Sequence, residues 1–186
     1  MPAHHAFHDV TGSKRRFLLF GAVAVLAAAA GILLNTWRLG GVGAGEGATD
    51  AVMATRLADL QGRTQALSQW RGKVLVVNFW ATWCAPCREE IPAFVRLQDQ
   101  YRAQGLQFVG IAIDQRDPVL AFVREFGINY PVLLGGIETV DMSRHAGNRV
   151  GTLPFTLIFD RAGKIAATEV GGVKEAWLQA IIKPLL

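Results

Sequence analysis

Two cysteines, Cys84 and Cys87, are the residues of this sequence best suited to chemistry, and they are the only cysteines in 186 residues. An apolar run before them predicts a strand and the pattern after them predicts a helix, so Cys84 falls at or just before a helix N-terminus. Unpaired backbone N–H groups and the helix dipole favour a thiolate there. Lowering a thiol pKa from about 8.5 to about 7 raises its ionised fraction at pH 7 from about 3% to about half. The pair therefore predicts an attacking Cys84 and a resolving Cys87, one helical turn further on.

Other roles for the pair have less support in the sequence. A structural disulfide that closes four residues would contribute only about 2 kcal/mol through loop entropy. A zinc site needs two more ligands at suitable spacing, and His145 stands alone. A thiol-based Cu(I) carrier stays open as an alternative, because thiolates suit soft metals, with Met142 and His145 as candidate further ligands. A thiol peroxidase is disfavoured, since its attacking cysteine would have no immediately adjacent CxxC partner.

The elements that must position the cysteines can be predicted from apolar spacing. Lys73–Trp80 is a nearly continuous apolar run, typical of a strand buried on both faces. After the cysteines, apolar residues recur every three or four positions until Gly105, which predicts a helix. Leu106–Ile113 predicts a second strand, and Asp117-Pro118 predicts an N-cap and first residue of a helix that runs to about Phe126. A strand–helix–strand unit of this kind predicts an α/β fold.

The end of the chain predicts a hairpin and a closing helix. Phe155–Phe159 predicts a strand, and Asp160–Lys164 predicts a turn into a further strand at Ile165–Val170. Glu175–Ile182 has the apolar spacing of a helix that packs on the sheet.

Composition excludes several classes of protein. Hydrophobic residues make up 51% of the chain and charged residues 18%, whereas disordered chains combine low hydrophobicity with high net charge. The net charge is +4, but residues 50–186 carry 15 Lys and Arg against 13 Asp and Glu, with no basic cluster. A nucleic-acid groove needs clustered cations, so no nucleic-acid partner is expected.

The front of the chain predicts a membrane anchor. Phe17–Leu34 contains eighteen residues without a charge, long enough as a helix to span about 27 Å of bilayer. Lys14, Arg15 and Arg16 precede this run, which predicts a cytoplasmic N-terminus and an exported remainder. A cleaved signal peptide ending near Ala28–Ala30 is the alternative, and it too exports the remainder.

These patterns divide the chain into four parts. Residues 1–16 form a cytoplasmic stub and residues 17–34 the transmembrane anchor. Residues 35–51 form a Gly-rich linker, with five glycines in Gly40–Gly47, and residues 52–186 form the folded domain.

The sequence around the cysteines resembles that of a known family. Trp83-Cys84-Ala85-Pro86-Cys87 after an apolar strand resembles the WCxxC motif of the thioredoxin superfamily. The wider string from Gly72 to Glu90 resembles the membrane-anchored TlpA/ResA-like thiol–disulfide oxidoreductases, and the similarity covers about residues 52–183.

This resemblance implies a thioredoxin-like fold, with a mixed central sheet flanked by helices. An N-terminal β-hairpin would lie near Arg56–Leu67, turning at Gly62-Arg63. The long stretch between Cys87 and Pro154 implies an inserted strand and helix.

The resemblance also implies further site residues. Leu153–Pro154 corresponds to the cis-proline loop, and together with Trp83 and Pro86 it would bind an incoming substrate peptide. Glu90 would stand beside the cysteines and accept the Cys87 proton. Cytosolic thioredoxins usually have a buried Asp where this chain has Asn78, so that proton relay is missing.

The function implied is thiol–disulfide exchange with exported proteins on the periplasmic side of a bacterial inner membrane, in the direction of reduction. Related proteins act on apocytochrome c or on copper-site assembly proteins. A membrane thiol donor of the CcdA or DsbD type would supply electrons. The cofactor would be the redox-active Cys84–Cys87 disulfide alone, with no metal.

Overall fold

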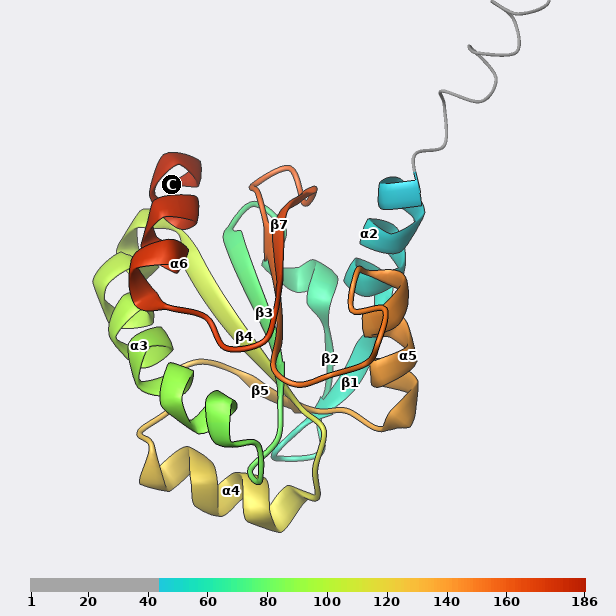
Figure 1. Ribbon diagram of the computed structural model, residues 1–186, viewed down its shortest axis with the longest axis vertical. Coiled ribbons are helices and arrows are strands. Elements are labelled where there is room, and N and C mark those ends of the chain that lie inside the picture. The colour runs from blue at the N-terminus through green and yellow to red at the C-terminus, as the bar shows by residue number, and fades with distance from the viewer. Residues whose placement is uncertain (1–43) are drawn as a thin grey trace, which may run out of the picture. The chain divides into compact units, whose positions relative to one another are not determined.

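The computed structural model describes residues 44–186, so the predicted stub, the predicted anchor and the first part of the predicted linker lie outside the described residues (Figure 1). Between residues 44 and 186, no helix has the length and apolar character needed to cross a membrane.

The described chain forms one mixed seven-stranded sheet with the strand order β2-β1-β5-β4-β3-β6-β7. Strands β3, β4 and β5 run parallel, and the other neighbouring pairs are antiparallel, as the resemblance predicts. The strands are β1 (Arg56–Asp59), β2 (Thr64–Ala66), β3 (Val74–Trp80), β4 (Leu106–Ala112), β5 (Val132–Leu134), β6 (Phe155–Phe159) and β7 (Ile165–Val170).

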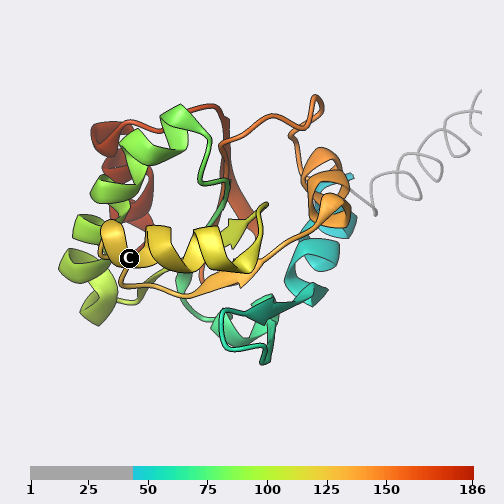
Figure 2. The same ribbon diagram turned by 90° about the horizontal axis from the view of Figure 1, so that it is seen from below.

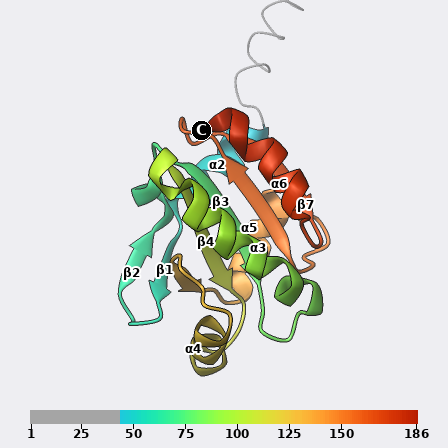
Figure 3. The same ribbon diagram turned by 90° about the vertical axis from the view of Figure 1, so that its left-hand side faces the viewer.

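Helices cover both faces of this sheet. Figure 2 shows α3 and α6 on one side and α2 and α5 on the other, and in Figure 3 α3 and α6 lie in front of the sheet. The helices are α2 (Ala44–Ala54), α3 (Ala85–Tyr101), α4 (Arg116–Glu125), α5 (Ile137–His145) and α6 (Glu175–Ile182), with short 3₁₀ turns at Leu67–Trp70, Arg102–Gln104 and Lys183–Leu185.

Strand β3 lies at the centre and is buried along its whole length. Its alternate side chains enter two different cores, since successive residues of a strand point to opposite faces. Val74, Val76 and Trp80 pack under α3, α4 and α6, and Leu75, Val77 and Phe79 pack under α2 and α5. This double burial explains the continuous apolar run in the sequence. Asn78 is the one polar residue of β3, and by this alternation it lies on the α3 face.

The predicted hairpin, insertion and closing elements are confirmed. Strands β1 and β2 are joined at a turn in which Asp59 N–H donates to the Arg63 carbonyl (2.9 Å) and Gly62 adopts a φ of 79°. Strand β5 and helix α5 are the inserted strand and helix, and β6, β7 and α6 have the predicted bounds.

Two predicted boundaries are wrong. The linker prediction fails for residues 44–51, which begin α2, because Val52 and Met53 are fully buried against the sheet and fix the end of that helix. Helix α4 begins at Arg116 with Gln115 as its N-cap, two residues earlier than the predicted Asp117 cap. Proline in the first turn of a helix is tolerated without marking its first residue, since the first N–H groups have no intrahelical partner.

Gly110 provides a test of the central packing. It pairs with Asn78 on one side and Val132 on the other, and a Cβ atom there would lie 2.7 Å from Trp80 Nε1. Trp80 is fully buried and cannot move aside freely. We expect Gly110→Ala to lower the free energy of unfolding by about 1–3 kcal/mol, measured by denaturant titration.

The matched control is Gly47→Ala in α2. A Cβ atom at Gly47 would meet nothing within 4 Å, and this residue is exposed. Because alanine has a higher helix propensity than glycine, the control should raise the free energy of unfolding by up to about 1 kcal/mol. An equal loss of stability in both variants would show that crowding at Gly110 is not the cause.

Candidate active site

The two cysteines lie where β3 gives way to α3, as predicted from the sequence. Cys84 is the N-cap of α3 with an extended backbone, and its carbonyl accepts the Arg88 N–H at 3.2 Å. Cys84 and Cys87 are joined in a disulfide, with their Cα atoms 5.3 Å apart. Cys84 is 5% exposed and Cys87 is fully buried, so Cys84 is the sulfur nearer to the surface.

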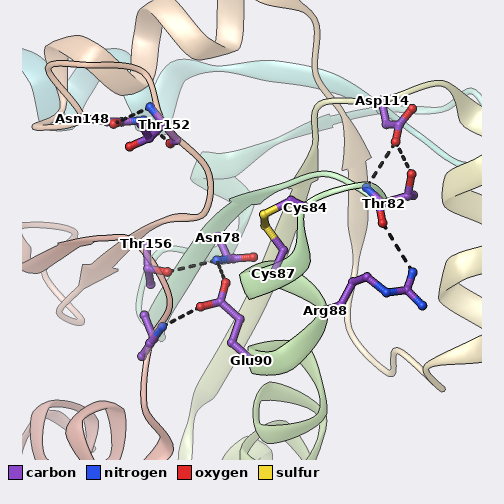
Figure 4. The surroundings of a disulfide bond; sticks show 11 residues. Asn78, Thr82, Cys84, Cys87, Arg88, Glu90, Asp114, Asn148, Thr152 and Thr156 are labelled. Atoms are coloured by element: carbon purple, nitrogen blue, oxygen red, sulfur yellow. Dashed lines mark hydrogen bonds between the residues drawn. A yellow bond between two sulfur atoms is a disulfide. The ribbon is translucent and has the colours of Figure 1, made fainter.

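The turn before Cys84 is fixed by contacts with two other elements. The Asp114 carboxylate, just after β4, accepts hydrogen bonds from the Thr82 N–H and hydroxyl groups (Figure 4). Arg88 donates to the Thr82 carbonyl at 3.4 Å and lies over the rings of Phe122 on α4 and of Phe126, the C-cap of that helix. The sequence offered no signal for the contacts with Asp114 and with the two phenylalanine rings, because they join segments more than thirty residues apart.

The predicted cis-proline loop is confirmed. The Leu153–Pro154 bond is cis, Pro154 is buried and Leu153 is half-buried. Asn148, which the sequence analysis missed, holds this loop from within: its amide donates to the Thr152 carbonyl at 2.9 Å and accepts the Thr152 N–H at 3.1 Å. An asparagine in a Gly-rich loop is ordinary turn composition, so only the fold shows its role.

Trp83 and Pro86 are the other two predicted substrate-binding residues; Trp83 immediately precedes Cys84, and Pro86 lies between the two cysteines in the first turn of α3. Trp83 is 71% exposed, and a tryptophan so exposed beside a buried cysteine pair is available for contact with another molecule. Pro86 is exposed, and its Cβ would lie 3.5 Å from a Cβ atom at Gly172 in the β7–α6 loop.

Glu90 lies one helical turn after Cys87 and is only 3% exposed. Its carboxylate accepts two hydrogen bonds, from Asn78 Nδ2 at 2.8 Å and from the Val173 N–H at 2.7 Å. Burial raises the pKa of Glu90 from 4.5 to about 7, although both hydrogen bonds oppose this rise. Glu89, in contrast, is exposed.

Asn78 connects the buried carboxyl to the neighbouring strand. Besides Glu90, its Nδ2 donates to Thr156 Oγ1 at 3.0 Å across the β3–β6 pair. The sequence analysis treated Asn78 only as a missing aspartate. In the structure, the carboxyl group in this region is that of Glu90 on α3, and Asn78 donates a hydrogen bond to it.

Between residues 44 and 186, no group of three or more His, Cys, Asp or Glu side chains is arranged to hold a metal ion. The candidate copper ligands Met142 and His145 both lie on α5, and Met142 accepts the Thr55 hydroxyl at 2.7 Å on the face opposite α3.

The mixed sheet, the disulfide at a helix start and the cis-proline define a thioredoxin-like α/β protein. A family model described as Redoxin matches residues 44–182, and the chain therefore belongs to the Redoxin family.

Curated relatives agree with the predicted ResA-like resemblance. The chain is similar to the thiol-disulfide oxidoreductase ResA of Bacillus subtilis, with 28% identity over 92% of this chain and 95% of that protein. It is 36% identical to ResA of Geobacillus thermodenitrificans over 59% of this chain. The chain spans 61% of the length of that protein and of ResA from Geobacillus kaustophilus.

Solved structures show the same fold. A thioredoxin-family thiol:disulfide interchange protein from Chlorobium tepidum superposes with a TM-score of 0.64 at 30% identity, over 70% of this chain and 92% of that one. A thiol:disulfide interchange protein from the same organism described as a putative DsbE has a TM-score of 0.63 at 26% identity, over the same shares.

The raised pKa of Glu90 makes stability depend on pH. The folded protein binds the Glu90 proton more tightly than the unfolded chain does, so this contribution is complete below pH 4.5 and is lost as pH rises through about 7. We expect the free energy of unfolding of the oxidised protein, relative to Glu90→Gln, to fall by on the order of 3 kcal/mol across this range. Parallel pH profiles for the two proteins would contradict the buried, ionisable carboxyl.

Proposed function

We propose that this protein is a thiol–disulfide oxidoreductase that reduces disulfides of exported proteins. The observation that carries the proposal is the Cys84–Cys87 disulfide at the start of α3, with the outer sulfur on Cys84. The similarity to proteins named as thiol-disulfide oxidoreductases supports it. The reduced Cys84 and Cys87 pair carries the two electrons and becomes the disulfide when it delivers them, so the proposed reaction uses no other cofactor.

The reaction begins with the reduced pair. The Cys84 thiolate attacks one sulfur of a substrate disulfide, which forms a mixed disulfide and releases the other substrate sulfur as a thiolate. The helix N-terminus stabilises the Cys84 thiolate before the attack.

The second step resolves the mixed disulfide. The Cys87 thiol gives its proton to the Glu90 carboxylate, and the Cys87 thiolate attacks Cys84 Sγ. The Cys84–Cys87 bond forms, the bond to the substrate breaks, and the second substrate sulfur leaves as a thiolate that takes up a proton. One substrate disulfide is reduced to two thiols while the protein pair is oxidised.

The substrate peptide would bind beside the cis-proline. The exposed Trp83, next to Cys84 in the chain, and the half-buried Leu153 would provide apolar contacts, and the exposed Thr152 immediately precedes Leu153 in the loop. A peptide could add there as a short extended segment next to Pro154.

The proposed setting is the periplasmic face of a bacterial inner membrane, with residues 17–34 as a single-pass anchor. The charges before that segment support this orientation. A structural neighbour from Corynebacterium glutamicum, 25% identical to this chain, is described as a secreted thiol-disulfide isomerase. In an oxidising periplasm the pair must be reduced again by a membrane thiol donor of the CcdA or DsbD type. Apocytochrome c and copper-site assembly proteins are the proposed substrates.

A trapping experiment tests the direction of attack and the substrate. In Cys87→Ser, resolution is blocked, so mixed disulfides through Cys84 should accumulate in the membrane fraction and be identified by mass spectrometry. Cys84→Ser is the matched control and should trap far less, because Cys87 is fully buried. Equal trapping by both variants would contradict Cys84 as the attacking residue, and a trapped set without cytochrome or copper-assembly precursors would contradict the proposed substrates.

A pH–rate profile tests the role of Glu90. The rate of resolution should rise as pH passes through about 7, because only the ionised carboxyl can accept the Cys87 proton. Glu90→Gln should remove this inflection and slow resolution above pH 7 by about tenfold or more. Glu89→Gln, an exposed neighbour on the same helix, should leave the profile unchanged. An unaltered inflection in Glu90→Gln would show that another group accepts the proton.

A further inference from the structure

The amide oxygen of Asn78 is a buried acceptor with no hydrogen-bond partner among the described residues. The other end of the same amide is fully used, since Nδ2 donates to both Glu90 Oε1 and Thr156 Oγ1. An unpaired buried acceptor in a residue only 3% exposed is unfavourable by about 1–3 kcal/mol. A second state in which this oxygen accepts a hydrogen bond would remove that unfavourable free energy.

The hydrogen bonds of Glu90 determine where a proton on it must lie. Oε2 accepts the backbone N–H of Val173, a group that can only donate. Only Oε1 faces a partner that can rotate to present an acceptor, the Asn78 side-chain amide, so we place a proton on the carboxyl group at Oε1. Nδ2 is also a donor, so protonation sets two donors against each other in a buried site.

We propose that the Asn78 amide turns by about 180° when Glu90 takes up a proton, so that Oδ1 accepts the new Glu90 O–H and Nδ2 turns toward Cys87. This inference rests on the proposed role of Glu90 as acceptor of the Cys87 proton and assigns Asn78 as a positioning residue for that step. The turn gives the unpaired oxygen a partner and removes the conflict between the two donors.

Thr156 allows the turn without any movement of the backbone. Its hydroxyl accepts from Nδ2 in the present state, and because a hydroxyl both donates and accepts, it can donate to Oδ1 after the turn. Val173 keeps its bond to Oε2 in both states. The amide can thus exchange its two ends between partners that are already in place.

The side of the amide that is unpaired faces the cysteines. Asn78 lies on the α3 face of β3, the same face that packs against Cys87. Figure 4 shows the Asn78 amide oxygen directed toward Cys87 and the nitrogen directed toward Glu90 and Thr156. After the turn, the NH₂ group would face Cys87 at the moment when its proton has moved to Glu90.

In this step the proton moves from Cys87 to Glu90 and does not leave the site. Cys87–SH and the Glu90 carboxylate become Cys87–S⁻ and the carboxylic acid, and the turned amide accepts from the acid while it donates to the thiolate. Tyr130 is the other titratable group that senses the Glu90 charge, and burial followed by that charge raises its pKa, so it stays neutral. Among the charged neighbours along α3, Glu89 is exposed and Arg88 is engaged with Thr82 and α4.

Nuclear magnetic resonance on the oxidised full-length protein tests the turn directly. Above the Glu90 pKa of about 7, the Asn78 NH₂ protons should show nuclear Overhauser contacts to the Glu90 side chain; below it, those contacts should be replaced by contacts to the Cys87 Hβ protons. The change should share its midpoint with the Glu90 carboxyl ¹³C shift. Gln98 is an internal control, since its amide is bonded at both ends to β4 backbone and should not change.

Unchanged Asn78 contacts at both pH values would overturn the proposal, whatever the activity shows. The proposed function is tested separately by the Glu90→Gln rate profile, so the two can fail independently. Asn78→Leu supplies a second measurement. If the amide turns, this variant removes a hydrogen bond from the carboxylate and from the acid alike, so the midpoint for resolution should move by much less than one pH unit. An upward shift of about one pH unit or more in a folded Asn78→Leu protein would show that the amide stabilises the carboxylate alone, and would count against the proposal.

Discussion

The buried carboxyl of Glu90 is the group on which the arrangement of this site depends. A carboxyl group in the interior is unfavourable unless donors are fixed around it. Here one donor comes from β3, through Asn78, and the other from the loop after β7, through Val173. Helix α3 thus cannot shift against the sheet or against this loop without leaving the carboxyl unpaired, and the cysteines at its start are held by the same constraint.

The loop between β7 and α6 extends this constraint to the proline. Gly171 N–H donates to the Pro154 carbonyl at 2.9 Å, Gly172 lies against Pro86, and Val173 reaches Glu90. Three consecutive residues therefore contact the cis-proline loop, the turn between the cysteines and the buried carboxyl. The surface proposed for substrate binding and the group proposed for proton transfer are in this way parts of one packed unit.

Local sequence patterns were sufficient to predict an element where burial follows one regular pattern along the whole segment. Strand β3 was predictable because it is buried on both faces, and α6 was predictable because its apolar spacing is regular. The same reasoning failed for residues 44–51, where local glycine content favoured a linker and burial of Val52 and Met53 favoured a helix. It also misplaced the start of α4, because a first-turn proline does not identify the first helical residue.

The sequence by itself determined the α/β class and the place of the cysteines at a helix start, because each depends on neighbouring residues in the chain. The cis-proline and Glu90 were identified through a family resemblance and not through a local pattern. Only the tertiary structure decided that Glu90 is buried, that Asn78 is its donor and that Val173 fixes its other oxygen. Those bonds join residues 12 and 83 positions apart, and no local pattern encodes such a contact. The pKa of the carboxyl group follows from that burial, so it too depends on the fold.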